Sequence, residues 1–396
     1  MSSKFYTSKP TLRMLAASVV SFFLFIFVSA FSVAYAENDD GELITFYGPN
    51  PVAGSFAEEV DYGNEPRKSS QILSYCKKPG GSQRPSAYEI ECPRGSVAEI
   101  TDFEARTEAT FTVNENKFRL SSLIPNRKYH VTITSPDGEV VWEHDVMQTG
   151  ALRQIYMGNT GNVRDLGGWP ADGGTLNYGL LYRGAAIQYM GPDTERWVAL
   201  NVQREIDLRS DGERYSTDNN LQIQHETSPI PGASYGHYGI TGYYGVYRNG
   251  TRPVIVSAVS DLMCAVVNGN PCYFHCAAGA DRTGTIAFIL EAVCGVSRSD
   301  IDKDFELTSF YSQRTRTYDM YADMANYFDE YGCESLRDNV IQWLIDSDMS
   351  LDLINDFRKA MINGTPEHLH PEDYGLEPVL NENAIQSLRE AIENAF

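Results

Sequence analysis

Residues 275 to 284 read His275-Cys276-Ala277-Ala278-Gly279-Ala280-Asp281-Arg282-Thr283-Gly284. The short run Cys272–His275 before this stretch is typical of a buried strand, and the apolar residues of 286–293 after it are typical of a buried helix. A loop that leads from a strand into a helix turns successive backbone N–H groups inward, and the helix dipole adds partial positive charge there. The stretch therefore predicts an anion-binding loop.

Cys276 stands at the start of this loop, where a thiol becomes reactive. A cysteine beside an arginine at a helix N-terminus has a pKa well below its usual value of about 8.5. The resulting thiolate is a nucleophile for phosphorus and forms a covalent thiophosphoryl intermediate. Arg282 offers a planar fork for two phosphate oxygens. Thr283 is interpreted as a hydrogen-bond donor to the sulfur, and His275 as a residue that orients the loop.

Fixed hydrogen-bond donors of the loop can stabilise the transferring phosphoryl group by themselves. We therefore expect the protein to use neither a metal nor a cofactor. The predicted phosphate-binding residues are Ala277, Ala278, Gly279, Ala280, Asp281 and Arg282.

The leaving group needs a proton from a carboxylic acid. Asp281, inside the loop, is the first candidate for this general acid, and its alternative role is to hold the loop by accepting backbone N–H bonds. Asp207, Asp211 and Glu213 are the other candidates, because they lie on or just after the predicted strand that carries Arg209.

The stretch is similar to the signature of the cysteine-dependent protein tyrosine phosphatase superfamily, and it most resembles the bacterial tyrosine-phosphatase-like family with the loop HCxAGKDRTG. Further segments resemble that family over residues 155 to 363: 161–168 (GNVRDLGG), 181–184 (LYRG), 206–210 (IDLRS) and 302–309 (DKDFELTS). The resemblance implies an α/β phosphatase fold, a central sheet flanked by helices, and substrates that include phosphotyrosine and phosphoinositides.

One position departs from the family pattern. Ala280 stands where the family usually has a lysine, which relatives use as a second cation for highly charged headgroups. We therefore expect a singly phosphorylated substrate such as phosphotyrosine, with an inositol phosphate or phosphoinositide as the alternative. A non-catalytic phospholigand-binding or adhesion protein is the alternative of another class, although the cysteine and arginine that such a protein could dispense with are both intact.

Other polar residues of the C-terminal region have two interpretations. Asn162, Arg164, Asp165 and Arg183 either contact substrate or form a buried network that braces the site, and the network is favoured. A Tyr/Gly-rich loop over 234–250 is either a lid that stacks an aryl phosphate or an ordinary surface loop. Its tyrosines are Tyr235, Tyr238, Tyr243, Tyr244 and Tyr247.

The first 36 residues are interpreted as a signal peptide. Lys4, Lys9 and Arg13 precede the apolar run 14–33, and Ala34-Tyr35-Ala36 is a small-residue cleavage site. The apolar run is long enough to span a bilayer, so an uncleaved membrane anchor is the alternative. Either way we expect the rest of the chain to work outside the cytoplasm, in the periplasm or secreted.

Residues 37–150 are interpreted as a small all-β domain that precedes a catalytic domain over 151–396. The runs 109–113, 128–134 and 139–143 have strand character, and the segment from Leu123 to Tyr129 resembles the tyrosine corner of fibronectin type III-like sandwiches.

Charge and cysteine content limit the partners. The chain carries 32 basic and 53 acidic residues, a net charge of −21, which disfavours nucleic acid and anionic lipid surfaces as partners. A phosphorylated protein or a small phosphate monoester must therefore be captured by a local cationic site. Export permits disulfides, and Cys76 with Cys92 is the predicted pair because the two flank a Pro/Gly/Ser-rich stretch.

Overall fold

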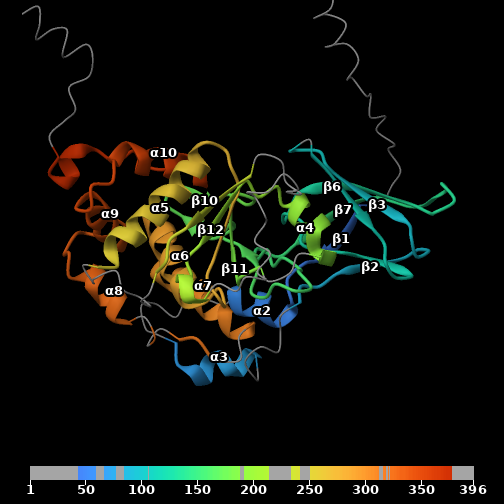
Figure 1. Cartoon of the computed structure of the whole chain (residues 1–396), viewed down its shortest axis with the longest axis horizontal. Helices are drawn as coiled ribbons and strands as arrows, with labels where there is room; N and C mark the ends of the chain where they lie inside the picture. Colours follow the sequence, from blue (N-terminus) through green and yellow to red (C-terminus); the bar gives the residue numbers. More distant parts are fainter. Residues whose placement is uncertain are drawn as a thin grey trace, which may run out of the picture. The chain divides into compact units, whose positions relative to one another are not determined.

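The computed structural model describes most of the chain after its first 42 residues (Figure 1). The described residues are 43–58, 67–76, 84–105, 107–187, 191–213, 233–240, 250–311, 315–317, 320 and 322–376. The predicted signal peptide lies outside them and stays a prediction. Within them, none of the helices combines the length and apolar character that a membrane crossing requires.

The N-terminal part contains two sheets. A five-stranded sheet has the order β1-β7-β6-β3-β4, and a two-stranded antiparallel sheet pairs β2 with β5. The strands are β1 (Ile44–Tyr47), β2 (Tyr88–Glu91), β3 (Val97–Asp102), β4 (Thr107–Thr112), β5 (Lys117–Leu120), β6 (Lys128–Thr134) and β7 (Val140–Thr149).

The buried face of these strands follows the alternation in their sequences. In β6, for example, Tyr129, Val131 and Ile133 are buried while the residues between them are not. The Tyr129 hydroxyl accepts a hydrogen bond from the Ile124 N–H at 3.1 Å. This is the contact that the resemblance to a tyrosine corner implied, and it fastens the loop before β6 to the strand.

The expectation that residues 37–150 are all-β is wrong for two segments. α2 (Pro51–Ala57) and α3 (Ser69–Cys76) are helices. Asn50 caps α2, because its side chain accepts hydrogen bonds from the N–H groups of Val52 and Ala53, and proline is well suited to the first helical turn. Both helices bury apolar residues, among them Phe56 and Ile72, in the large core that the C-terminal part forms. The division into two domains stays a prediction.

The predicted disulfide between Cys76 and Cys92 is also wrong in this structure, because both are free thiols. Cys76 is buried with the large core of the C-terminal part, whereas Cys92 is buried in the core between the N-terminal strands. Burial raises the pKa of each thiol. The two cysteines therefore behave as small apolar core residues.

The C-terminal part is built on a central sheet with the order β13-β12-β14-β11-β8. Its first four strands in that order are parallel, and β8 is antiparallel to β11. Parallel strands carry their C-terminal ends to the same edge of a sheet, where α/β proteins place their ligands. The strands are β8 (Arg164–Asp165), β11 (Leu181–Gly184), β12 (Arg204–Asp207), β13 (Ser234–His237) and β14 (Cys272–His275).

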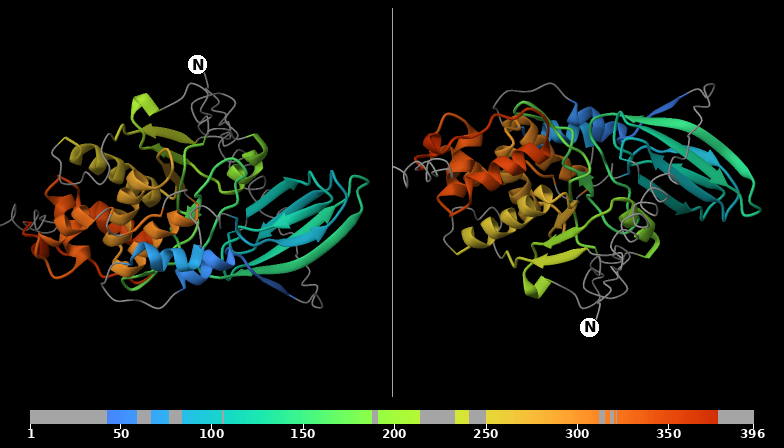
Figure 2. Two further views of the ribbon diagram at one scale, coloured as in Figure 1. Left: turned by 90° about the horizontal axis from the view of Figure 1, so that it is seen from below. Right: turned by 90° about the horizontal axis from the view of Figure 1, so that it is seen from above.

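Helices α5 and α6 pack against this sheet; α7 and α9 pack against α6, α8 against α9, and α10 against α5. Figure 2 shows the helices that follow residue 250 gathered together in both views. Every residue of α6 after Asp281 is buried, which explains why its apolar residues are not confined to one face of the helix. The helices of this part are α4 (Thr194–Ala199), α5 (Arg252–Val267), α6 (Asp281–Val293), α7 (Arg298–Leu307), α8 (Ala322–Asp329), α9 (Leu336–Ile345) and α10 (Leu351–Met361).

The remaining elements are short. A three-stranded sheet has the order β15-β10-β9. These pieces and the 3₁₀ turns are β9 (Pro170–Ala171), β10 (Gly174–Leu176), β15 (Ile362–Gly364), η1 (Gly191–Asp193), η2 (Asp211–Glu213), η3 (Thr308–Phe310) and η5 (Pro371–Tyr374).

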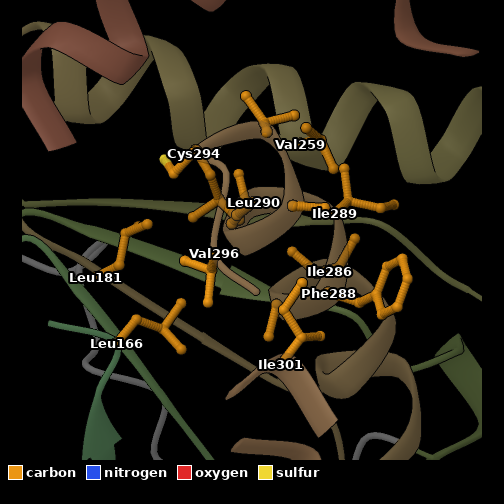
Figure 3. Close-up of a cluster of buried hydrophobic side chains, with 14 of the residues drawn as sticks. Leu166, Leu181, Val259, Ile286, Phe288, Ile289, Leu290, Cys294, Val296 and Ile301 are labelled. Carbon is orange, nitrogen blue, oxygen red and sulfur yellow. The ribbon is translucent and has the colours of Figure 1, made fainter. Parts of the chain in front are cut away.

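The large core lies around α6. Figure 3 shows Ile286, Ile289 and Leu290 of this helix among side chains from the sheet and from α5, including Leu181 and Val259. All five are at most 2% exposed. A helix buried to this degree fixes the position of its own N-terminus, and the loop 276–280 is attached there.

The predicted α/β architecture of the C-terminal part is confirmed. The strand 272–275 and the helix after the loop lie where the sequence predicts them. The strand predicted before Arg209 is β12, at 204–207.

Candidate active site

The loop 276–280 connects β14 to α6, as predicted. Ala280 precedes α6 and makes no side-chain capping hydrogen bond, so no cap occupies the first-turn N–H groups. Gly279 has φ +64°, and a Cβ there would come within 2.3 Å of the Gly184 carbonyl. Only glycine permits both this backbone conformation and this close approach.

The carbonyl groups of the loop are held from outside. Asn162 Nδ2 donates to the carbonyl oxygens of Ala278 at 3.2 Å and Gly279 at 2.9 Å. Arg183 Nη2 donates to the Gly279 oxygen at 3.1 Å, and the Ala186 N–H donates to the Ala277 oxygen at 3.2 Å. Carbonyls that point outward leave the loop N–H groups to point inward, which is the arrangement of an anion-binding nest.

The residues that hold the loop converge on Asp304 of α7. Arg164 Nε donates to Asp304 Oδ1 at 2.8 Å, and Arg183 Nη1 donates to Asp304 Oδ2. Arg164 also donates to the Asn162 side-chain oxygen at 2.5 Å. The side chains of both arginines and Asp304 are at most 2% exposed. The favoured interpretation as a buried bracing network is therefore confirmed for Asn162, Arg164 and Arg183, and Asp165 forms a separate buried ion pair with Arg153 at 2.9 Å.

Cys276 is 3% exposed at the centre of this arrangement. Burial opposes ionisation of its thiol, but four contacts outweigh it and lower the pKa of Cys276. These contacts are the Thr283 hydroxyl, the charge of Arg282 and the backbone N–H groups of Thr283 and Ala278. The loop thus favours a thiolate.

Arg282 lies at the start of α6 with its guanidinium 4% exposed. Its Nη2 donates to Glu213 at 2.8 Å, its Nη1 donates to the other oxygen of the same carboxylate, and Nη1 also reaches the Ile240 oxygen at 3.2 Å. The hydrogen bond from Arg282 lowers the pKa of Glu213 to about 2. Glu213 therefore stays ionised and orients the arginine fork.

His275 is fully buried and bonded on both sides. Its Nε2 lies 2.9 Å from Glu205 Oε1, and its Nδ1 lies 3.3 Å from the Cys276 carbonyl oxygen. Burial alone would lower the pKa of His275, but the hydrogen bond to Glu205 and the charge of Asp207 raise it. An imidazole held in this way suits the orienting role that the sequence suggested.

The four candidates for the general acid differ in exposure and in the groups that they contact. Asp207 is buried, which opposes ionisation, but hydrogen bonds from Arg209 lower its pKa to about 2. Glu213 is held at a similar pKa by Arg282, so neither carboxyl carries a proton near neutral pH. Asp211 is 92% exposed beside His237. Asp281 lies at the end of the loop itself, 22% exposed, with an oxygen 3.1 Å from Arg316 Nε.

Two of the five tyrosines proposed as a lid have a different position. Tyr235 lies in strand β13 and donates to Asp207 at 3.0 Å, and Tyr238 donates to Asp261 at 2.5 Å. Both hydroxyls form hydrogen bonds within the protein, and the lid interpretation stays a prediction. The other three, Tyr243, Tyr244 and Tyr247, lie outside the described residues.

The sequence analysis missed three residues of the site. Asp304 falls in the segment 302–309 that resembles the family, so its position was found but its role was not. Glu205 lies within the predicted strand that carries Arg209 but was given no role, and Arg316 is in no motif; neither gave a signal. Among the described residues no group of three or more His, Cys, Asp and Glu could hold a metal ion. The expectation of no cofactor stays a prediction.

Comparison with known proteins finds two similarities. Residues 155–375 match the model of the tyrosine phosphatase family. A protein of Cupriavidus necator named "putative tyrosine-protein phosphatase" is 30% identical over 156 residues, which is 35% of this chain and 57% of that protein. The chain thus spans little more than half the length of this relative.

Proposed function

The chain belongs to the tyrosine phosphatase family, and we propose from this premise that it hydrolyses phosphate monoesters, phosphotyrosine in particular, through a cysteinyl-phosphate intermediate on Cys276. The observation that carries the proposal is the loop 276–282. There one cysteine with a lowered pKa lies among inward backbone N–H groups and beside a buried arginine.

The proposed first step is an in-line displacement. The Cys276 thiolate attacks phosphorus, the bond from phosphorus to the leaving oxygen breaks, and that oxygen takes a proton from Asp281. Arg282 and the loop N–H groups hold the three remaining oxygens, and their fixed position stabilises the transferring group.

The proposed second step returns the enzyme to its starting state. A water molecule gives its proton to Asp281 and attacks phosphorus, the sulfur–phosphorus bond breaks, and inorganic phosphate leaves. The sulfur departs as a thiolate, which the nearby Thr283 hydroxyl and the charge of Arg282 stabilise.

The role of Asp281 has a direct test in the choice of leaving group. Asp281→Asn is expected to lower kcat by about 10²- to 10⁴-fold for phenyl phosphate, whose leaving group needs a proton. The loss for p-nitrophenyl phosphate should be much smaller, because p-nitrophenolate leaves without one. Steady-state kinetics on the two esters measure the difference, with Asp211→Asn as the matched control. Equal losses on both esters would assign Asp281 to holding the loop through Arg316.

The proposed preference for phosphotyrosine depends on Ala280. This residue is fully buried and adds no charge to the loop. A panel of phosphotyrosine peptide, phosphoserine peptide, inositol hexakisphosphate and phosphoinositide is expected to give the highest kcat/KM for phosphotyrosine. Ala280→Lys is expected to raise the ratio of inositol phosphate to phosphotyrosine activity by about tenfold, the value of one charge-assisted contact. An unchanged ratio, with the protein folded, would remove this argument for the substrate.

We also propose that the protein acts outside the cytoplasm, in the periplasm or as a secreted protein, and that residues 1–36 are removed. The support is the charged, apolar and small-residue order of that segment. N-terminal sequencing of the mature protein should begin at Glu37; a chain that retains Met1 in the membrane fraction would indicate an anchor.

A further inference from the structure

A cavity of about 400 Å³ lies next to the bracing network and apart from the residues that bind the phosphoryl group. It is lined by Asn50 and Arg84 of the N-terminal part, by residues between Ile155 and Val163, and by Tyr311, just after η3. Its volume falls within the range of small-molecule sites.

Two hydroxyl groups of this cavity can donate a hydrogen bond to a ligand. The Thr160 hydroxyl is buried in a residue 3% exposed and has no hydrogen-bond partner among the described residues. The Tyr311 hydroxyl accepts from Gln154 Nε2, which leaves its own O–H to donate. A buried hydroxyl without a partner is costly, so a ligand that accepts hydrogen bonds would stabilise this site.

The charged side chain in the lining of the cavity is an arginine. The lining includes Arg84 and no carboxylate, although the chain as a whole carries −21. The Arg84 guanidinium lies 5.2 Å from the centre of the Tyr156 ring, and Arg196 lies 5.0 Å from the same ring. No ion pair to Arg84 occurs among the described residues. An aromatic ring holds a stacked guanidinium in place, and the N–H groups at the edge of the guanidinium can still donate hydrogen bonds to an anion.

We propose that this cavity binds a small organic anion, carrying a phosphate or a carboxylate, at a site separate from the catalytic loop. Arg84 neutralises the anion, and Thr160 and Tyr311 donate to its oxygens. Asn162 lines the cavity and also holds the carbonyls of Ala278 and Gly279, so a bound anion lies one side chain away from the loop. The proposal does not depend on the proposed phosphatase activity.

Binding is tested with two probes, glycerol 2-phosphate and citrate, by isothermal titration calorimetry on the full chain. The Arg282→Ala variant serves as the background, since it lacks the fork of the catalytic loop and does not consume the phosphate ester. We expect at least one probe to bind with Kd below about 1 mM. Arg84→Gln in this background should weaken that binding about tenfold or more, because it removes a charge-assisted contact.

Arg94→Gln is the matched control, since Arg94 is an exposed arginine that does not line the cavity. Binding of glycerol 2-phosphate alone would assign the site to organic phosphates, and binding of citrate alone would assign it to carboxylates. The proposal is overturned if neither probe binds with Kd below about 1 mM, or if Arg84→Gln and Arg94→Gln change the binding equally.

Discussion

Cys276→Ser is expected to lower kcat on p-nitrophenyl phosphate by about 10⁴-fold or more. The hydroxyl of serine has a far higher pKa than a thiol, and the contacts that lower the pKa of Cys276 cannot make it an alkoxide near neutral pH. The side chain is nearly the same size, so the loop and its contacts should persist. Substrate should therefore still bind, with KM changed by less than about threefold, which separates lost chemistry from lost folding.

Cys264→Ser is the control for this change. Cys264 is an exposed cysteine of α5, and its substitution should leave kcat unchanged. A Cys276→Ser protein that keeps a tenth or more of the activity would mean that phosphate transfer uses another nucleophile, and the proposed intermediate would have to be given up.

Asp304→Asn is expected to have the largest effect on stability. Asp304 balances the charges of Arg164 and Arg183, all three in positions at most 2% exposed. Breaking a buried ion pair by removing one partner costs about 3–5 kcal/mol, because the remaining charge is left without compensation. Urea unfolding followed by tryptophan fluorescence measures this loss. Asp356→Asn, on the exposed side of α10, removes the same charge and should change the free energy of unfolding by less than about 0.5 kcal/mol.

The neighbouring Glu291 can reduce this effect and must be included in the design. Glu291 is 1% exposed, its two carboxylate oxygens have no hydrogen-bond partner among the described residues, and burial raises its pKa well above the usual value. When Asp304 is neutral, the two arginines favour ionisation of Glu291. The full cost should therefore appear in the Glu291→Gln background. If Asp304→Asn is no more destabilising there than Asp356→Asn, the bracing network is not held by charge.

The loss of the Asp304 charge should also change activity, because Arg183, which pairs with Asp304, donates to the Gly279 carbonyl of the loop. An Asp304→Asn protein that remains folded at low temperature should have a raised KM, since the loop N–H groups lose their fixed direction.

Most of the catalytic loop could be predicted from the sequence, because its residues are adjacent in the chain. A cysteine, a glycine and an arginine between a short apolar strand and an apolar helix define one local geometry. Asp304 could not be assigned in this way. It meets Arg164 across 140 residues and Arg183 across 121 residues, and only the packing of α7 beside α6 brings them together.

In the N-terminal part, the spacing of apolar residues predicts the strands but not the helices. Strands β4, β6 and β7 were predictable from alternating and β-branched residues. α2 is seven residues long and its sequence, PVAGSFA, contains a glycine and few strong helix formers, so its helix depends on the Asn50 cap and on burial of Phe56. The predicted disulfide failed for a similar reason, because spacing in the chain gives no information on the separate cores that enclose Cys76 and Cys92.

The ionisation of Cys276 is measured most directly by the pH dependence of its alkylation. Iodoacetamide reacts with the thiolate, so the rate of inactivation follows the fraction ionised. The structure predicts a midpoint below the ordinary thiol value of about 8.5, and a higher midpoint in Thr283→Ala, which lacks the hydroxyl that helps to lower the pKa of Cys276. A midpoint at or above about 8.5 in the unmodified protein would contradict the central claim that this loop holds a thiolate.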